Sequence, residues 1–146
     1  TSFPSLARAV YRLPATGGTP VLLLDVAVGA TGPDWSPDGT KIAYASTREP
    51  YDIWILPADG GEATALPAGP GRNGNPCWSP DGARIAFSCD GDIWIMAATG
   101  ESAHQVTAEP DGETPTSWSP DGRALCVQRQ RVVDRVTDVW ILRLAE

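Results

Sequence analysis

The sequence predicts an all-β fold built from repeated four-stranded antiparallel sheets. The first observation behind this prediction is that the stretch WSPDG occurs three times, at Trp35–Gly39, Trp78–Gly82 and Trp118–Gly122. The second is that each copy is followed by a strand-like run and then by a motif of the form D-[IV]-W-I-[LM]. The tryptophans of WSPDG are 43 and 40 residues apart. A period of this length indicates a repeat architecture.

Each repeat predicts four short strands, which in the first complete repeat lie near 33–36, 41–46, 51–57 and 63–66. Pro-Asp-Gly after the first strand predicts a β-turn, because proline fixes φ and glycine adopts a positive φ without strain. The third strand, IWIL, is apolar on both faces, whereas a sheet with water on one side alternates. Sheets stacked face to face are therefore expected, and such four-stranded units are the blades of a β-propeller.

The pattern also reaches the N-terminus. Tyr11 lies 24 residues before the first WSPDG, and the same spacing separates the second tryptophan of each following repeat from the next WSPDG. The N-terminal segment is therefore interpreted as the back half of an earlier repeat, although apolar residues in 6–13 also have helical spacing. We expect one propeller segment over 1–146, with a partial repeat at 8–28 and repeats at 33–68, 76–107 and 115–144. The repeated residues assigned to architecture are Trp35, Asp38, Gly39, Trp54, Trp78, Asp81, Gly82, Trp94, Trp118, Asp121, Gly122 and Trp140.

WSPDG, an IAF-like strand and a DIWIM-like strand that ends in a turn together resemble the TolB-like β-propeller repeat, a WD-like repeat. The resemblance covers about residues 11–144. It implies a propeller scaffold that binds a protein or peptide, and it favours an extracytoplasmic location. The repeat also occurs beside DNA-binding domains and in propellers that gate serine peptidases, so it does not fix the function. Propellers of this family usually have six or more blades.

The predicted strands make only about three blades, which is half a propeller. An open arc would expose apolar blade faces and free sheet edges. We expect a homodimer in which two chains complete a six-bladed ring head to tail. The alternatives are a fragment of a longer propeller, since the chain begins with Thr rather than Met, and an engineered or excised half-propeller without native function.

Composition excludes several classes of function. The net charge of −7 disfavours nucleic-acid binding. The longest strongly apolar run, Val21–Leu24, is far too short for a transmembrane helix. The three cysteines, Cys77, Cys89 and Cys126, lack zinc-ligand spacing and are odd in number, so we expect small buried side chains.

The sequence does not predict an enzyme, a metal site or another cofactor. His104 is the single histidine, and neither a G-x-S-x-G motif nor a phosphate-binding loop is present. A substrate-gating fragment of a serine peptidase and a metal-dependent hydrolase or lyase remain the enzymatic alternatives. Two series of aspartates recur from repeat to repeat. The first, Asp38, Asp81 and Asp121, is expected to cap the WSPDG turn. The second, Asp52, Asp92 and Asp138, is expected to cap the entry to the third strand, with a Ca²⁺-binding ring as the weaker alternative.

Candidate binding residues lie where the repeats differ. The two tryptophans of a repeat are 19, 16 and 22 residues apart, so the connection between the second and third strands varies. In a propeller this connection emerges on the same face as the connection between blades, and loops on a rigid scaffold often carry recognition. Ordinary solvated charges are the alternative for any one of these residues. The candidates on this face are Arg48, Glu49, Tyr51, Arg72, Asn73, Arg129, Arg131 and Arg135.

Overall fold

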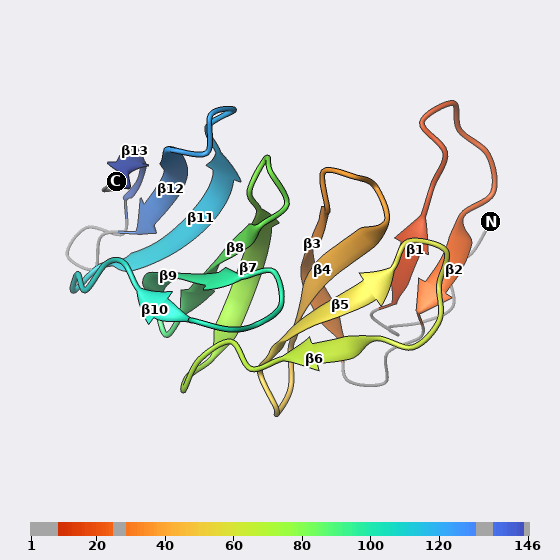
Figure 1. The fold of residues 1–146 in the computed structure, drawn as a ribbon, viewed down its shortest axis with the longest axis horizontal. Helices are drawn as coiled ribbons and strands as arrows, with labels where there is room; N and C mark the ends of the chain where they lie inside the picture. The colour runs from red at the N-terminus through yellow and green to blue at the C-terminus, as the bar shows by residue number, and fades with distance from the viewer. Residues whose placement is uncertain (1–8, 25–28, 131–135, 145–146) are drawn as a thin grey trace.

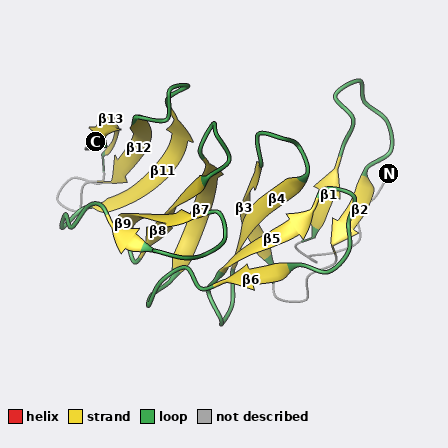
Figure 2. Cartoon of the chain, in the orientation of Figure 1, coloured by secondary structure: helices red, strands yellow, loops and turns green. Residues whose placement is uncertain are grey.

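The computed structural model describes residues 9–24, 29–130 and 136–144, and these residues form thirteen β-strands and no helix (Figure 2). The strands make four antiparallel sheets, so the predicted all-β class is confirmed. The first sheet contains β1 (Val10–Arg12) and β2 (Val21–Leu24), and the second contains β3 (Ala30–Trp35), β4 (Lys41–Ser46), β5 (Ile53–Pro57) and β6 (Thr64–Leu66). The third contains β7 (Asn73–Trp78), β8 (Arg84–Cys89), β9 (Asp92–Ala97) and β10 (His104–Gln105), and the fourth contains β11 (Gly112–Trp118), β12 (Ala124–Gln130) and β13 (Thr137–Arg143).

Each sheet is a meander in which consecutive strands pair. The four sheets follow one another along an arc, with the first sheet at one end and the fourth at the other (Figure 1). The second and third sheets have the four strands of a complete propeller blade, whereas the first has two strands and the fourth has three. The chain thus forms part of a propeller.

Packing between neighbouring sheets follows from the two apolar faces of the third strand. In β5, Ile53 is fully buried in a cluster with the third sheet, and Leu56 is fully buried in a cluster with the first sheet. A third cluster joins Ile93 of the third sheet to Leu125 of the fourth. Because successive side chains of a strand point to opposite faces, a strand that is apolar throughout packs its sheet against both neighbouring sheets.

The first strand of each complete meander carries an irregularity at an equivalent place. The register shifts between Thr31 and Asp34 in β3 and between Gly74 and Cys77 in β7. Gly32 has a φ of 58°, and a Cβ there would lie 3.1 Å from the Cα of Asn75. Glycine at this position therefore allows the bulges of two neighbouring sheets to approach closely.

Candidate functional site

The connections at one end of the strands come together around Tyr51 and Arg72. The Arg72 guanidinium carbon lies 5.0 Å from the centre of the Tyr51 ring, and the Asn73 amide donates to the Tyr51 carbonyl at 3.1 Å. Asp90, in the β8–β9 turn, accepts from the Arg72 amide through Oδ1 at 3.0 Å, and its own amide donates to the Arg72 carbonyl at 3.1 Å. We call this end of the molecule the connection face.

Three of the sequence-predicted residues, Tyr51, Arg72 and Asn73, are thus in direct contact. Arg48 and Glu49 are exposed on the β4–β5 connection. The predicted residues Arg131 and Arg135 lie outside the described residues.

Two polar side chains at the start of inner strands are buried on the connection face. Asn73 begins β7 and is 5% exposed, and neither its Oδ1 nor its Nδ2 has a partner among the described residues. Glu113 occupies the equivalent place in β11, 40 residues later, and is 3% exposed. A buried polar group without a partner is costly, so such a group is a marker of a site.

Arg129 of β12 holds one oxygen of the Glu113 carboxylate. Its Nε and Nη2 donate to the same atom, Oε1, at 2.8 and 2.5 Å, and Oε2 has no donor among the described residues. The guanidinium carbon also lies 4.8 Å from the centre of the Trp140 ring in β13. The Glu113 hydrogen bond raises the pKa of Arg129 above its usual value.

A polar pocket of about 300 Å³ is lined by Glu113 together with other residues of the third and fourth sheets. It reaches the connection face, because Gly91 in the β8–β9 turn and Gly112 at the start of β11 also line it. The other residues that line it are Ser88, Glu113, Thr114, Gln128, Gln130 and Thr137. Hydroxyls and amides predominate, which suits a polar ligand rather than an apolar one.

The first aspartate series lies in the WSPDG turns, at the opposite end of the strands. Asp38 Oδ1 accepts from Ser36 Oγ at 2.6 Å and from the Thr40 amide at 3.0 Å. Asp81 accepts from Ser79 Oγ at 2.5 Å, and Asp121 accepts from Ser119 Oγ at 2.6 Å. These hydrogen bonds lower the pKa of all three carboxyls, and that of Asp38 falls to about 2.

The turn carboxylates are expected to make the fold sensitive to acid. Their folded pKa values lie below the unfolded value of 3.8, so their stabilisation is present above that value and is lost as pH falls through the folded pKa. We expect the urea midpoint to fall between about pH 4 and pH 2. The triple variant Asp38→Asn, Asp81→Asn and Asp121→Asn is expected to fall less steeply in this range. Equal acid dependence of the variant and the unchanged protein would contradict this role.

The second aspartate series lies at or beside the start of the third strand of each sheet. Asp52 precedes β5, Asp92 begins β9 and Asp138 lies in β13 opposite Arg129. Asp92 Oδ2 accepts from Gln105 Nε2 at 2.9 Å, which ties β9 to the neighbouring strand. Within the described ranges, no three His, Cys, Asp or Glu side chains come together in a group able to hold a metal ion.

His104 lies on β10 and is exposed. Its Nδ1 is 3.1 Å from the Ser102 carbonyl oxygen. This is a local contact on an edge strand, as expected for a surface histidine.

Comparison with known proteins places the repeat in a family. The family model of the TolB beta propeller domain matches residues 8–134. The chain belongs to this family. This confirms the resemblance that the WSPDG and DIWIM motifs indicate. No curated protein sequence matches the chain.

Solved structures of TolB proteins share the fold. TolB from Agrobacterium tumefaciens is 29% identical with a TM-score of 0.74, and the match covers 92% of this chain and 57% of that chain. TolB from Acinetobacter baumannii is 23% identical with a TM-score of 0.74, and the match covers 97% of this chain and 39% of that one. The chain thus spans about two fifths to three fifths of the length of these TolB structures.

An enzyme has a similar fold. A gluconolactonase from Xanthomonas campestris is 19% identical with a TM-score of 0.74, and the match covers 99% of this chain and 47% of that chain. At this identity the likeness shows the fold alone.

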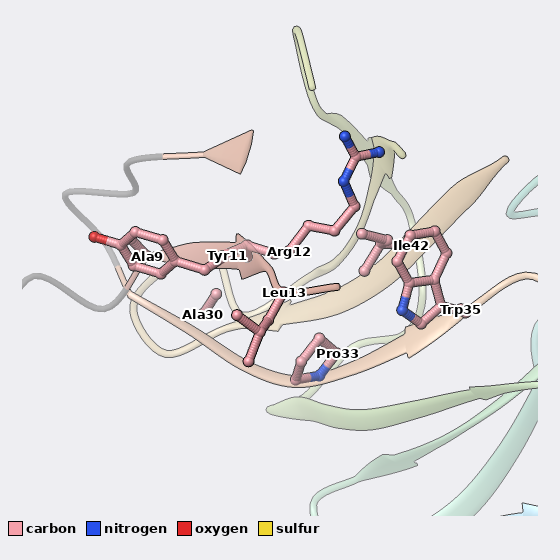
Figure 3. A pocket seen from close by; sticks show the side chains of 9 residues that line it. Ala9, Tyr11, Arg12, Leu13, Ala30, Pro33, Trp35 and Ile42 are labelled. Carbon is pink, nitrogen blue, oxygen red and sulfur yellow. The ribbon is translucent and has the colours of Figure 1, made fainter. Parts of the chain in front are cut away.

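Both ends of this TolB-type arc expose apolar side chains. At the N-terminal end, an open pocket of about 410 Å³ lies between β1 and the inner strands of the second sheet, and Figure 3 shows Tyr11, Leu13 and Trp35 along it. At the other end, Val139 and Ile141 of the edge strand β13 are 70% and 64% exposed. In a complete propeller blade these positions face further strands.

The cysteines differ from the prediction in one case. Cys77 and Cys89 are buried, and burial raises the pKa of Cys77 to about 12. Cys126 is only half-buried, because the fourth sheet ends the arc and one face of β12 has no neighbouring sheet among the described residues.

None of the described residues forms a helix long and apolar enough to span a membrane.

Sequence reasoning missed two residues of the connection face, Asp90 and Glu113, and it missed the contact of Arg129 with Trp140. One signal was available for Glu113. It lies as far from the third WSPDG as Asn73 does from the second, so an alignment of the repeats pairs the two residues.

Proposed function

We propose that the chain is part of a non-enzymatic β-propeller scaffold that binds a protein or peptide on the connection face. The observation that carries this proposal is the stack of Arg72 on Tyr51, which backbone hydrogen bonds from Asn73 and to Asp90 hold in place. Arginine and tyrosine are frequent anchors of protein interfaces. An anchor that is already ordered loses less conformational entropy when a partner binds.

The rest of the propeller is supplied by a second copy of the chain or by a longer parent chain. The exposed apolar side chains of β1 and β13 support this part of the proposal, since exposed patches of this kind favour association. Light scattering over a dilution series distinguishes the two sources. A mass of two chains supports the head-to-tail homodimer, and a monomer supports a parent chain.

Membership of the TolB family is consistent with an extracytoplasmic location, which we include in the proposal. The enzymatic alternatives gain no support from His104, whose Nδ1 contacts the carbonyl oxygen of Ser102, two residues away. The gluconolactonase likeness adds no argument for activity, since it is a likeness of fold.

Selection from a random peptide library on the immobilised protein tests the binding role. Peptides that bind the unchanged protein are expected to bind the double variant Tyr51→Ala and Arg72→Ala about 30-fold more weakly, since two hot-spot side chains are lost. The matched control is Glu62→Ala, an exposed residue beyond the β5–β6 turn at the opposite end of the sheet. Equal binding by the double variant and the control, or a library from which no peptide is selected, would overturn the proposal.

A further inference from the structure

We propose that a second copy of the chain docks at the N-terminal end of the arc, where its β13 takes the place of β1 beside β2. This inference rests on the proposed function and deepens it, because it commits to a second copy and names the strands that meet. The first and fourth sheets lie at opposite ends of the arc, so they meet only between two chains (Figure 1). The first sheet has two strands and the fourth has three, which together is one more than a complete sheet of four, so one strand is surplus.

The sequence of the third strand favours β13 over β1. The triplet around its aromatic residue is Ile-Trp-Ile in β5 and β9, Val-Trp-Ile in β13 and Val-Tyr-Arg in β1. The last residue of the triplet faces a neighbouring sheet, and in β9 this residue, Ile95, is 3% exposed and lies in the apolar cluster with the fourth sheet. The same position in β1 is Arg12, a charged side chain that is 42% exposed, whereas β13 supplies Ile141. An isoleucine that faces the apolar second sheet buries more apolar surface than an arginine.

β1 is also the strand that is held less firmly. It has three residues, and its register with β2 is irregular between Val10 and Tyr11. β13 has seven residues, and each of them pairs with a residue of β12. Displacement of β1 therefore breaks fewer hydrogen bonds than displacement of β13. Val10 is the buried residue of β1 and has the same place in the triplet as Val139, so a valine would still cover that part of the second sheet.

The contact between the second and third sheets shows how the two ends would pack. There, Ala43 and Ile53 of one sheet cluster with Trp78 and Ile85 of the next. The residues at the same positions of the repeat are Cys126 and Val139 at one end of the arc and Trp35 and Ile42 at the other. Trp78 is 8% exposed and Ile53 is fully buried, whereas Trp35 is 46% exposed and Val139 is 70% exposed. The two ends thus carry the two halves of a contact that the chain already makes internally, which favours a second copy as the occupant.

The open pocket beside β1 marks the place of the inner strands of that copy. Residues of β1 and of the second sheet, Trp35 among them, line this pocket (Figure 3). In a complete sheet the first and second strands follow beside the third, so β11 and β12 would enter here next to β13. Between the third and fourth sheets, Trp118 Nε1 donates to the Cys77 carbonyl at 3.0 Å. The same spacing in the repeat lets Trp35 Nε1 donate to the Ser117 carbonyl of the second copy.

Light scattering over a dilution series tests the docking with two matched variants. Val139→Asp places a carboxylate in the proposed apolar contact and is expected to weaken the dimer at least about tenfold. Tyr11→Asp introduces the same side chain on the strand proposed to leave, and its dimer is expected to be at least as tight as that of the unchanged protein. Both side chains are exposed in the single chain, so both variants are expected to fold. A monomeric unchanged protein, a dimer that Val139→Asp leaves intact, or one that Tyr11→Asp weakens as much, would overturn the inference.

A cross-link between Leu22 and Trp140 tests the strand pairing itself. Leu22 lies opposite Tyr11 within one chain, and Trp140 has the place of Tyr11 in the triplet. The double variant Leu22→Cys and Trp140→Cys is therefore expected to form a disulfide-linked dimer on mild oxidation, because opposite residues of paired strands lie close together. Each single variant controls for the native cysteines, and a dimer without this link would refute the pairing. Neither experiment involves the connection face, so a failure here is distinct from a failure of the peptide selection.

Discussion

Replacing Phe87 by alanine is expected to lower the free energy of unfolding by about 3–5 kcal/mol. Phe87 is fully buried in β8, in the cluster that joins the second and third sheets. Its ring lies 6.4 Å from that of Trp94, centre to centre. Removal of the ring leaves a cavity between two sheets that cannot easily close, because hydrogen bonds to the neighbouring strands fix the position of each strand. Urea denaturation followed by tryptophan fluorescence measures the loss.

Two further substitutions show whether packing is the cause. Phe87→Leu keeps most of the buried volume and is expected to cost about 1–1.5 kcal/mol. Glu62→Ala removes an exposed side chain away from both ends of the arc and is expected to change stability by less than about 0.5 kcal/mol. If Phe87→Ala were no more harmful than Glu62→Ala, the apolar cluster between the sheets would not be what holds them together.

The sequence was sufficient to predict the strands because their signals are local. The run KIAYAS predicts a strand at 41–46, and β4 spans Lys41–Ser46. The apolar third strand predicts sheets on both sides, and Ile53 and Leu56 of β5 are buried against different neighbours. Turn residues and strand period act over a few positions, so a single sequence contains both.

The first strand of each repeat was predicted less well. A strand was expected near 33–36, whereas β3 begins at Ala30. The pairing continues through a bulge in which Gly32 has a positive φ, and glycine within a strand does not reveal whether the strand ends or bulges there.

The contacts of the connection face could not be predicted because they join distant residues. Arg72 reaches Tyr51 across 21 positions, and Arg129 reaches Glu113 across 16. Nothing in the local sequence distinguishes a buried Glu113 from a solvated loop carboxylate. Its burial follows from the neighbouring sheet, where the Gly91 carbonyl accepts from the Glu113 amide at 2.6 Å.

Replacing Arg129 by methionine is expected to destabilise the protein by about 3 kcal/mol, because it leaves the Glu113 carboxylate buried without its cation. The Glu113 side chain is 3% exposed, and that of Arg129 is 20% exposed. The partial exposure of Arg129 admits some water, so the loss lies at the lower end of the range for buried ion pairs. Methionine preserves a similar apolar contact with Trp140, so the change tests the charge rather than the packing. Urea denaturation at neutral pH measures it.

The matched control is Arg12→Met, which breaks the ion pair between Arg12 and Asp59. These side chains are 42% and 96% exposed, so the expected loss is below about 1 kcal/mol. The double variant Glu113→Leu and Arg129→Met is expected to recover most of the stability lost in Arg129→Met, because neither charge is then left buried. A double variant as unstable as the single one would mean that the loss in Arg129→Met does not come from a Glu113 carboxylate left buried without its cation.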